Sequence, residues 1–123
     1  MLHDLLPRVC TGVAKDMGGE AELRIVKGSP VVKNDPALTA RMRDVAVELV
    51  GADNVVDMDI RMGAEDFAYY THVMPGCFFR LGTGDPRKPG TQSGLHTAAF
   101  DIDEDAMMLG AAMMMAGALN ELQ

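Results

Sequence analysis

A chain of 123 residues that is 48% hydrophobic and 24% charged has the composition of one globular domain. Its formal net charge of −7 argues against nucleic acid and anionic membranes as partners, because long-range repulsion opposes the encounter. The most apolar run, residues 106–119, is shorter than the roughly 18 to 20 residues that span a bilayer, so a soluble protein is expected. Cys10 and Cys77 stand outside any C-x-x-C spacing and predict reduced thiols in the cytoplasm rather than a disulfide framework or a thiolate metal cage.

The first segment is predicted to hold one helix and one strand. Apolar residues recur at helical spacing until Gly18-Gly19, and Pro7 predicts that the helix begins or bends near it. Residues 20–26, "EAELRIV", alternate polar and apolar side chains as a strand with one buried face does. The apolar positions of the helix are Leu2, Leu6, Val9, Val13 and Met17.

A second helix follows, and its ends are marked by residues that favour helix termini. Asp35 is a good N-cap, Pro36 suits the first helical position and Gly51 suits the C-terminal stop. The buried stripe between them is formed by Leu38, Met42, Val45, Ala46 and Leu49.

The rest of the chain predicts short elements and one long helix. Residues 54–58 and 77–82 favour strands, the second launched by a Pro-Gly turn, and residues 64–73 favour a short helix. Residues 82–95 are loop by composition. The last helix is expected from about Glu104, with Asp103 as its cap.

This order of helices and strands predicts an α/β architecture in which helices cover a sheet. Three strands alone leave open edges, and open edges invite pairing. The chain is therefore expected either to form a homodimer or higher oligomer, or to be part of something larger.

Several linked motifs carry a family resemblance. The stretches "MGAEDFAYY", "PGCFFRLGTG" and "GLHTAAFDIDEDAM" stand in the order and approximate spacing found near the C-terminus of metal-dependent amidohydrolases, and with "VKNDPALT" they cover about two thirds of the chain. The sequence resembles the family of hippurate hydrolase, N-acyl-amino-acid deacylases and indole-acetyl-amino-acid hydrolases. The resemblance implies that residues 1–27 are the last helix and strand of a lid or dimerisation domain. Residues 28–123 are then the C-terminal part of a mixed-sheet, helix-covered catalytic domain.

The resemblance also implies roles for particular residues. His96, in the "L-H-[ST]" motif, corresponds to one ligand of a divalent metal, and a neutral imidazole suits Zn, Mn, Ni or Co. Glu65 and Asp66 match "E-D-F" and are given a supporting role beside the site. The backbone of Gly82, Thr83 and Gly84 is expected to help position an N-acyl amino acid or peptide-like substrate.

The family's "H-x-C-G-H-D-x-H" segment and the glutamate that acts as general base are not in this sequence. No complete ligand set can be assembled around His96, so no residue is assigned as catalytic and the isolated chain is expected to be inactive. A divalent metal is expected in the intact enzyme, and its absence from this fragment is left open. Hydrolysis of N-acyl amino acids by metal-activated water is then a property of a longer enzyme. The alternative is a non-catalytic module that self-associates or binds a partner.

Each assignment has a structural alternative. A lone loop histidine is more often a surface residue than a ligand, and His72 is expected to be a surface or capping residue. Glu65 and Asp66 suit a helix N-terminus equally well, because the helix dipole favours acidic side chains there. The methionines of the last helix are typical both of core filler and of a soft binding surface, and the helix is expected to be buried in an intact enzyme and partly exposed in a fragment.

Overall fold

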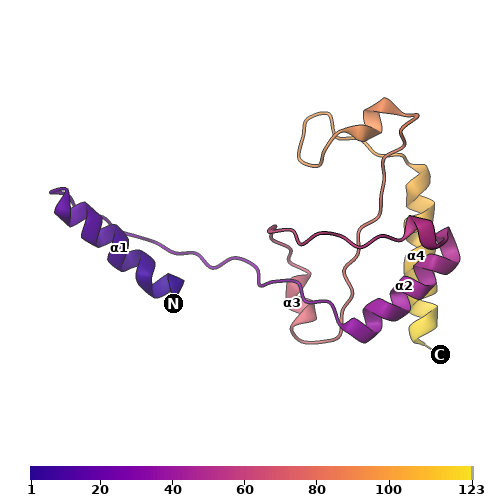
Figure 1. The fold of residues 1–123 in the computed structure, drawn as a ribbon, viewed down its shortest axis with the longest axis horizontal. Coiled ribbons are helices and arrows are strands. Elements are labelled where there is room, and N and C mark those ends of the chain that lie inside the picture. Colours follow the sequence, from indigo (N-terminus) through magenta and orange to yellow (C-terminus); the bar gives the residue numbers. More distant parts are fainter. Residues whose placement is uncertain (123) are drawn as a thin grey trace.

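A computed structural model describes residues 1–122. Figure 1 shows the order of its elements, in which two long helices lie side by side and a third lies apart from them. The helices and 3₁₀ turns are α1 (Leu2–Asp16), α2 (Pro36–Val50), η1 (Ala52–Asn54), α3 (Ala68–Thr71), η2 (Pro89–Gln92) and α4 (Asp105–Glu121).

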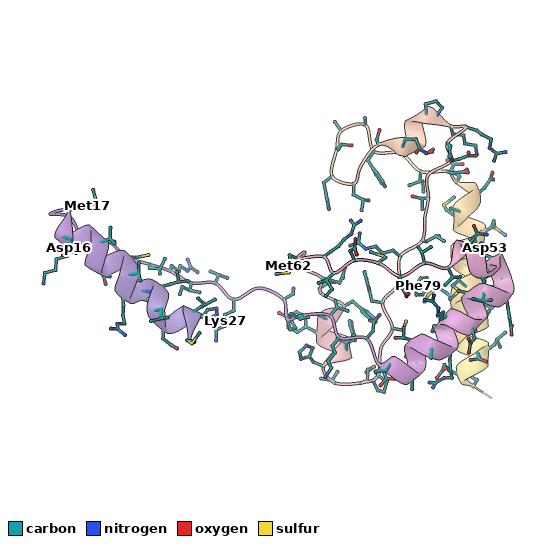
Figure 2. The ribbon with its side chains drawn as sticks, in the orientation of Figure 1. Asp16, Met17, Lys27, Asp53, Met62 and Phe79 are labelled. Atoms are coloured by element: carbon teal, nitrogen blue, oxygen red, sulfur yellow. The ribbon has the colours of Figure 1, made fainter. Side chains whose placement is uncertain are left out.

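The predicted N-terminal helix is confirmed as α1. It begins at Leu2, so Pro7 lies inside it, and the carbonyl of Pro7 accepts a 2.8 Å hydrogen bond from the Thr11 hydroxyl. Gly18 follows the helix with a φ of 77°, a backbone conformation that glycine adopts readily. No residue of α1 is buried, and its far end, marked by Asp16 and Met17 in Figure 2, points away from the rest of the chain.

The predicted strands are not formed within residues 1–122, which contain no strand. A strand is held by a ladder of backbone hydrogen bonds to a neighbour. Residues 20–26 make no backbone hydrogen bond to any other described residue, and residues 54–58 are likewise without a neighbouring strand. Alternation of polar and apolar residues indicates a segment suited to a sheet, but residues 1–122 supply no neighbouring strand for it to pair with.

The second helix is confirmed at both ends. The Asp35 side chain accepts a 2.8 Å hydrogen bond from the Leu38 N–H, and Pro36 is the first residue of α2. Gly51 ends the helix with a φ of 83°. These residues satisfy donors and acceptors that a helix end otherwise leaves unpaired.

The packing of α2 against α4 forms the main core. Val45 of α2 and Met113 of α4 are both buried, and Met42 lies against Gly117. The distance is short enough that a Cβ on Gly117 would lie 2.6 Å from the Met42 Sδ. Any side chain at position 117 would therefore require the end of the Met42 side chain to move.

The last helix begins one residue later than the sequence predicts. Its N-cap is Glu104, whose side chain makes no capping bond, while the Asp103 carboxylate accepts from the Asp105 N–H at 3.2 Å. Most of its methionines are exposed, as expected for this helix in a fragment; Met108 is 77% exposed, whereas Met113 is buried. None of the helices within residues 1–122 combines the length and apolarity needed to cross a membrane.

The segment before α2 holds the segment after α3. The Asn34 amide donates to the Phe78 carbonyl, and its oxygen accepts from the Phe78 N–H, both at 2.8 Å. The Asp35 N–H donates to the Gly76 carbonyl at 2.8 Å. A side-chain amide here takes the place of a neighbouring strand, and it fixes the extended residues 77–82 that lead into the candidate site.

Candidate functional site

An open hollow is lined by residues from three segments of the chain, 61–63, 80–84 and 91–101. Its volume is about 660 Å³, within the roughly 300 to 1,000 Å³ of sites that bind small molecules. Three of the residues singled out in the sequence meet there: His96, Thr83 and Gly84. Residues distant in the sequence are thus gathered around one space, which is the requirement for a binding site.

His96 lies in an exposed loop and has an unusual backbone conformation. It is the one residue other than glycine in the described chain with a positive φ, 64°. Such a conformation is uncommon for residues with a side chain and is a feature worth testing for function. The turn that contains it is held by the Thr97 hydroxyl, which donates to the Gly94 carbonyl at 2.8 Å.

The opposite wall is fixed by close backbone contacts. The Thr83 carbonyl accepts a 2.7 Å hydrogen bond from the Asp103 N–H. A Cβ on Gly84 would lie 3.0 Å from the Thr91 carbonyl oxygen, so glycine is needed for this approach. Gly82 is not among the described residues that line the hollow.

A buried aspartate organises the loop between the two walls. The Asp85 carboxylate accepts hydrogen bonds from the Arg87 N–H at 2.9 Å and from the Arg87 guanidinium at 2.8 to 3.1 Å. These bonds to Arg87 lower the pKa of Asp85 from 3.8 to about 2. The Asp85 N–H donates to the Thr91 hydroxyl at 2.8 Å, which fixes the other side of the loop.

A lysine ties the same loop to the start of α4. The Lys88 ammonium lies 2.5 Å from the Asp103 carboxylate and 3.4 Å from that of Asp105. The hydrogen bond to Asp103 raises the pKa of Lys88 and lowers that of Asp103. The loop that carries one wall of the hollow is therefore held at two points, Asp85 and Lys88.

Glu65 and Asp66 lie elsewhere in the described structure and do not line this hollow. The Glu65 carboxylate accepts a 3.2 Å hydrogen bond from the Phe67 N–H, just before α3. The Asp66 carbonyl accepts from the Tyr69 N–H at 3.0 Å. Both contacts are those of residues that start a short helix.

The donor set for a metal is incomplete within residues 1–122. No three side chains of His, Cys, Asp or Glu in this range come close enough together to hold a metal ion. A catalytic zinc site uses three protein ligands, and His96 supplies one imidazole. The described residues alone therefore do not fit a complete metal centre.

Two further residues line the hollow that the sequence did not single out, Arg61 and Arg80. Each stands beside a motif that was noted, in "R-M-G-A-E-D-F" and "F-F-R-L-G". Figure 2 labels their sequence neighbours Met62 and Phe79, which lie on the two extended segments. A basic residue next to a site motif in a chain of net charge −7 is the signal that could have identified them.

The family is decided by a profile that matches nearly the whole chain. The profile of peptidase family M20/M25/M40 covers residues 4–120. The chain belongs to this family. Enzymes of the M20 family are generally metal-dependent hydrolases of amide or peptide bonds, which agrees with the resemblance seen in the motifs.

Three curated relatives show how much of a longer protein the chain represents. It is 36% identical over 118 residues to "Putative amidohydrolase YhaA" of Bacillus subtilis, which is 96% of this chain and 29% of the relative. It is 33% identical over 84 residues to "IAA-amino acid hydrolase ILR1-like 6" of Arabidopsis thaliana, 68% of this chain and 18% of the relative. It is 39% identical over 95 residues to "Putative glutamate--cysteine ligase 2-3" of Rhodococcus jostii, 77% of this chain and 12% of the relative.

The chain thus spans less than a third of the length of these relatives. No solved structure matches it. M20 membership comes from the sequence, and the structure adds the hollow in which His96, Thr83 and Gly84 meet.

Proposed function

We propose that this chain is the C-terminal part of an M20 amidohydrolase that cleaves N-acyl amino acids or related amides. The observation that carries the proposal is the family match over residues 4–120 combined with the meeting of His96 and the Thr83-Gly84 backbone around one hollow. The printed names of two relatives, an amidohydrolase and an amino-acid conjugate hydrolase, support this class of substrate.

In this proposal His96 supplies one imidazole ligand to a divalent metal of the Zn, Mn, Ni or Co class. Such a metal activates water and polarises the amide carbonyl when bound. The other ligands and the general base come from residues outside this chain. The exposure of His96 in the described structure supports that arrangement, because its imidazole is open to a partner surface.

Glu65, Asp66 and the Gly82–Gly84 backbone are proposed to act around this ligand. Glu65 and Asp66 start α3 and hold the turn that follows Arg61 in the chain. The Thr83 and Gly84 backbone forms a wall against which a substrate can lie. These residues position the site and are assigned no proton transfer.

Residues 1–27 are proposed to belong to a lid domain, and residues 28–123 to the catalytic domain. The separation of α1 from the α2–α4 core supports the division (Figure 1). The extended residues 20–26, 54–58 and 77–82 are proposed to join a mixed sheet with strands from the rest of the enzyme. Most of their backbone groups make no hydrogen bond within the described residues; the exceptions are at Asn54, Val55 and Phe78.

The test is a chimera in which this chain replaces the 118-residue segment of YhaA that it matches. Release of amine from N-acetyl amino acids is measured for the chimera and for its His96→Ala and His72→Ala variants. His72 is the matched control, because its ring contacts the Val31 carbonyl at 2.9 Å and does not line the hollow. Hydrolysis that survives His72→Ala and disappears in His96→Ala is expected. Equal activity in the two variants would overturn the role of His96.

The isolated chain is expected to show no hydrolysis in the same assay with added Zn or Mn, because residues 1–122 supply no complete set of metal ligands. Turnover by the purified chain that disappears in His96→Ala would show that the site is complete without further residues.

A second candidate is a non-catalytic module that self-associates as a homodimer or higher oligomer. It is favoured by exposed apolar side chains on α1 and α4, such as Leu2 at 68% and Met108 at 77%. Sedimentation at micromolar concentration distinguishes the two. A strict monomer contradicts the module. An oligomer that stays associated when the remaining segments of the enzyme are added supports it.

A further inference from the structure

We propose, building on the proposed function of His96, that Thr97 is a positioning residue. Its hydroxyl holds the turn of residues 94–97 in the backbone conformation that places His96 at the hollow. Thr97 is not among the described residues that line the hollow, whereas Leu95 and His96 are. Thr97 therefore acts on the site through its neighbour His96, and it is assigned no contact with substrate or metal.

The backbone of His96 has a conformation that needs support. Leu95 and His96 are the two central residues of the turn, and His96 has a φ of 64°. A positive φ at the third residue is the pattern of a type II turn, in which glycine is favoured at that position. A side chain there brings its Cβ close to the following carbonyl oxygen, which is unfavourable. Such a conformation persists only where surrounding contacts hold it.

Thr97 supplies the contacts of this loop. Its hydroxyl donates to the Gly94 carbonyl at 2.8 Å and so joins the last residue of the turn to the first. Its carbonyl accepts a 3.2 Å hydrogen bond from the Phe100 N–H. Every hydrogen bond that residues 94–100 form within residues 1–122 involves Thr97. The hydroxyl is the part of these contacts that depends on the side chain at position 97.

The chain on both sides of the turn is fixed by other contacts. Before the turn, the Thr91 hydroxyl accepts a 2.8 Å hydrogen bond from the Asp85 N–H. After it, the Asp103 N–H donates to the Thr83 carbonyl at 2.7 Å. Because both ends of the loop are held, a change in φ at His96 acts mainly on the direction of its own side chain. A negative φ would swing the Cβ and the imidazole away from their present place at the hollow.

The experiment measures the backbone conformation of His96 by NMR in the 123-residue chain. At a φ of 64° the amide hydrogen and the Hα are nearly eclipsed, so the nuclear Overhauser effect between them is strong. Thr97→Val keeps the branched side chain and removes the hydroxyl. The ratio of left-handed to other conformers at His96 should fall about two- to fivefold, the change that corresponds to losing about 0.5 to 1 kcal/mol, and the signal should weaken. Thr97→Ser retains the hydroxyl and should restore the signal.

The matched control is Thr11→Val. Thr11 also donates its hydroxyl to a backbone carbonyl at 2.8 Å, that of Pro7, but inside α1 and outside the hollow. Its loss should leave the His96 signal unchanged. His96→Gly is a second control, because glycine adopts a positive φ without support. In that background Thr97→Val should shift the amide signals of residues 94–97 less than it does in the unmodified chain.

Three results would overturn the proposal: a weak His96 signal in the unmodified chain, an undiminished signal in Thr97→Val, or a loss that Thr97→Ser does not restore. Thr97 is exposed and lies outside α2 and α4, so the circular dichroism of these helices should be the same in all variants. A changed spectrum in Thr97→Val with an undiminished His96 signal would assign Thr97 to the fold and not to the turn.

The YhaA chimera separates this proposal from the proposed function. Its affinity for Zn should be weaker in Thr97→Val, by at most about fivefold, and should recover in Thr97→Ser, because only the fraction with His96 in place binds. A chimera that binds no Zn with any residue at position 97 would remove the proposed function, and the NMR result for the turn would stand. Unchanged affinity in Thr97→Val beside a weakened His96 signal would overturn the role of Thr97 in the site.

Discussion

The reciprocal hydrogen bonds between Asn34 and Phe78 predict a large local effect from one substitution. Asn34→Ala removes both bonds and leaves the Phe78 N–H and carbonyl without their partner. A typical hydrogen bond contributes about 1 kcal/mol net, so two contribute about 2 kcal/mol. Since ~1.4 kcal/mol is a factor of ten, opening of this segment should become roughly 30-fold more frequent.

Amide hydrogen exchange at Phe78 measures that opening directly, because exchange reports local unfolding free energy. The rate should rise about 30-fold in Asn34→Ala if exchange follows the opening equilibrium. Asn34→Asp is the informative intermediate, because a carboxylate still accepts from the Phe78 N–H and can no longer donate to its carbonyl.

The matched control is Asn54→Ala. Asn54 also donates its side-chain amide to a backbone carbonyl, that of Val50, at 2.7 Å, but at the end of α2. Its loss should leave exchange at Phe78 unchanged. An unchanged Phe78 rate in Asn34→Ala would refute the view that a side-chain amide holds residues 77–82 in place of a strand.

Two further predictions concern the loop and the helix contact. The pKa of Asp85 is lowered to about 2, so the stabilisation from its bonds to Arg87 is complete above the ordinary 3.8 and is lost as the pH falls through about 2. An NMR titration of the Asp85 carboxyl should have its midpoint near 2, moving toward 3.8 in Arg87→Gln; a wild-type midpoint at 3.8 would contradict the contact. Gly117→Val should lower the unfolding free energy by about 1 to 3 kcal/mol in urea, because the added atoms overlap Met42. Met42→Ala should reverse much of that loss. Gly12→Val is the control, because nothing lies within 4 Å of its Cβ position, and Met42→Ala should not offset its effect on stability.

The helices were predictable because their signals are local. Asp35, Pro36 and Gly51 act within a few residues of themselves, and the structure places both ends of α2 where these residues predict. The strands depended on partners. Residues 20–26 have the alternation of a strand, but sequence alternation carries no information on which neighbour supplies the hydrogen bonds.

The candidate site depends on contacts between segments that are far apart in the sequence, so the sequence predicted only part of it. The motifs predicted roles for His96 and the Gly82–Gly84 turn, and the hollow brings His96 together with Thr83 and Gly84. Arg61 and Arg80 were missed, because their relation to His96 depends on how two extended segments and a loop come together. Glu65 belongs to a motif that was singled out in the sequence, but it does not line the hollow. Its carboxylate accepts a hydrogen bond from the Phe67 N–H.

The central claim is that His96 is one ligand of a metal site completed outside this chain. The most direct test is the metal content, by mass spectrometry after gel filtration, of the YhaA chimera, its His96→Ala and His72→Ala variants, and the isolated chain, all incubated with Zn or Mn. The account predicts metal retained by the chimera and by His72→Ala, reduced in His96→Ala, and absent from the isolated chain. Full metal content in His96→Ala, or His96-dependent binding by the isolated chain, would contradict it.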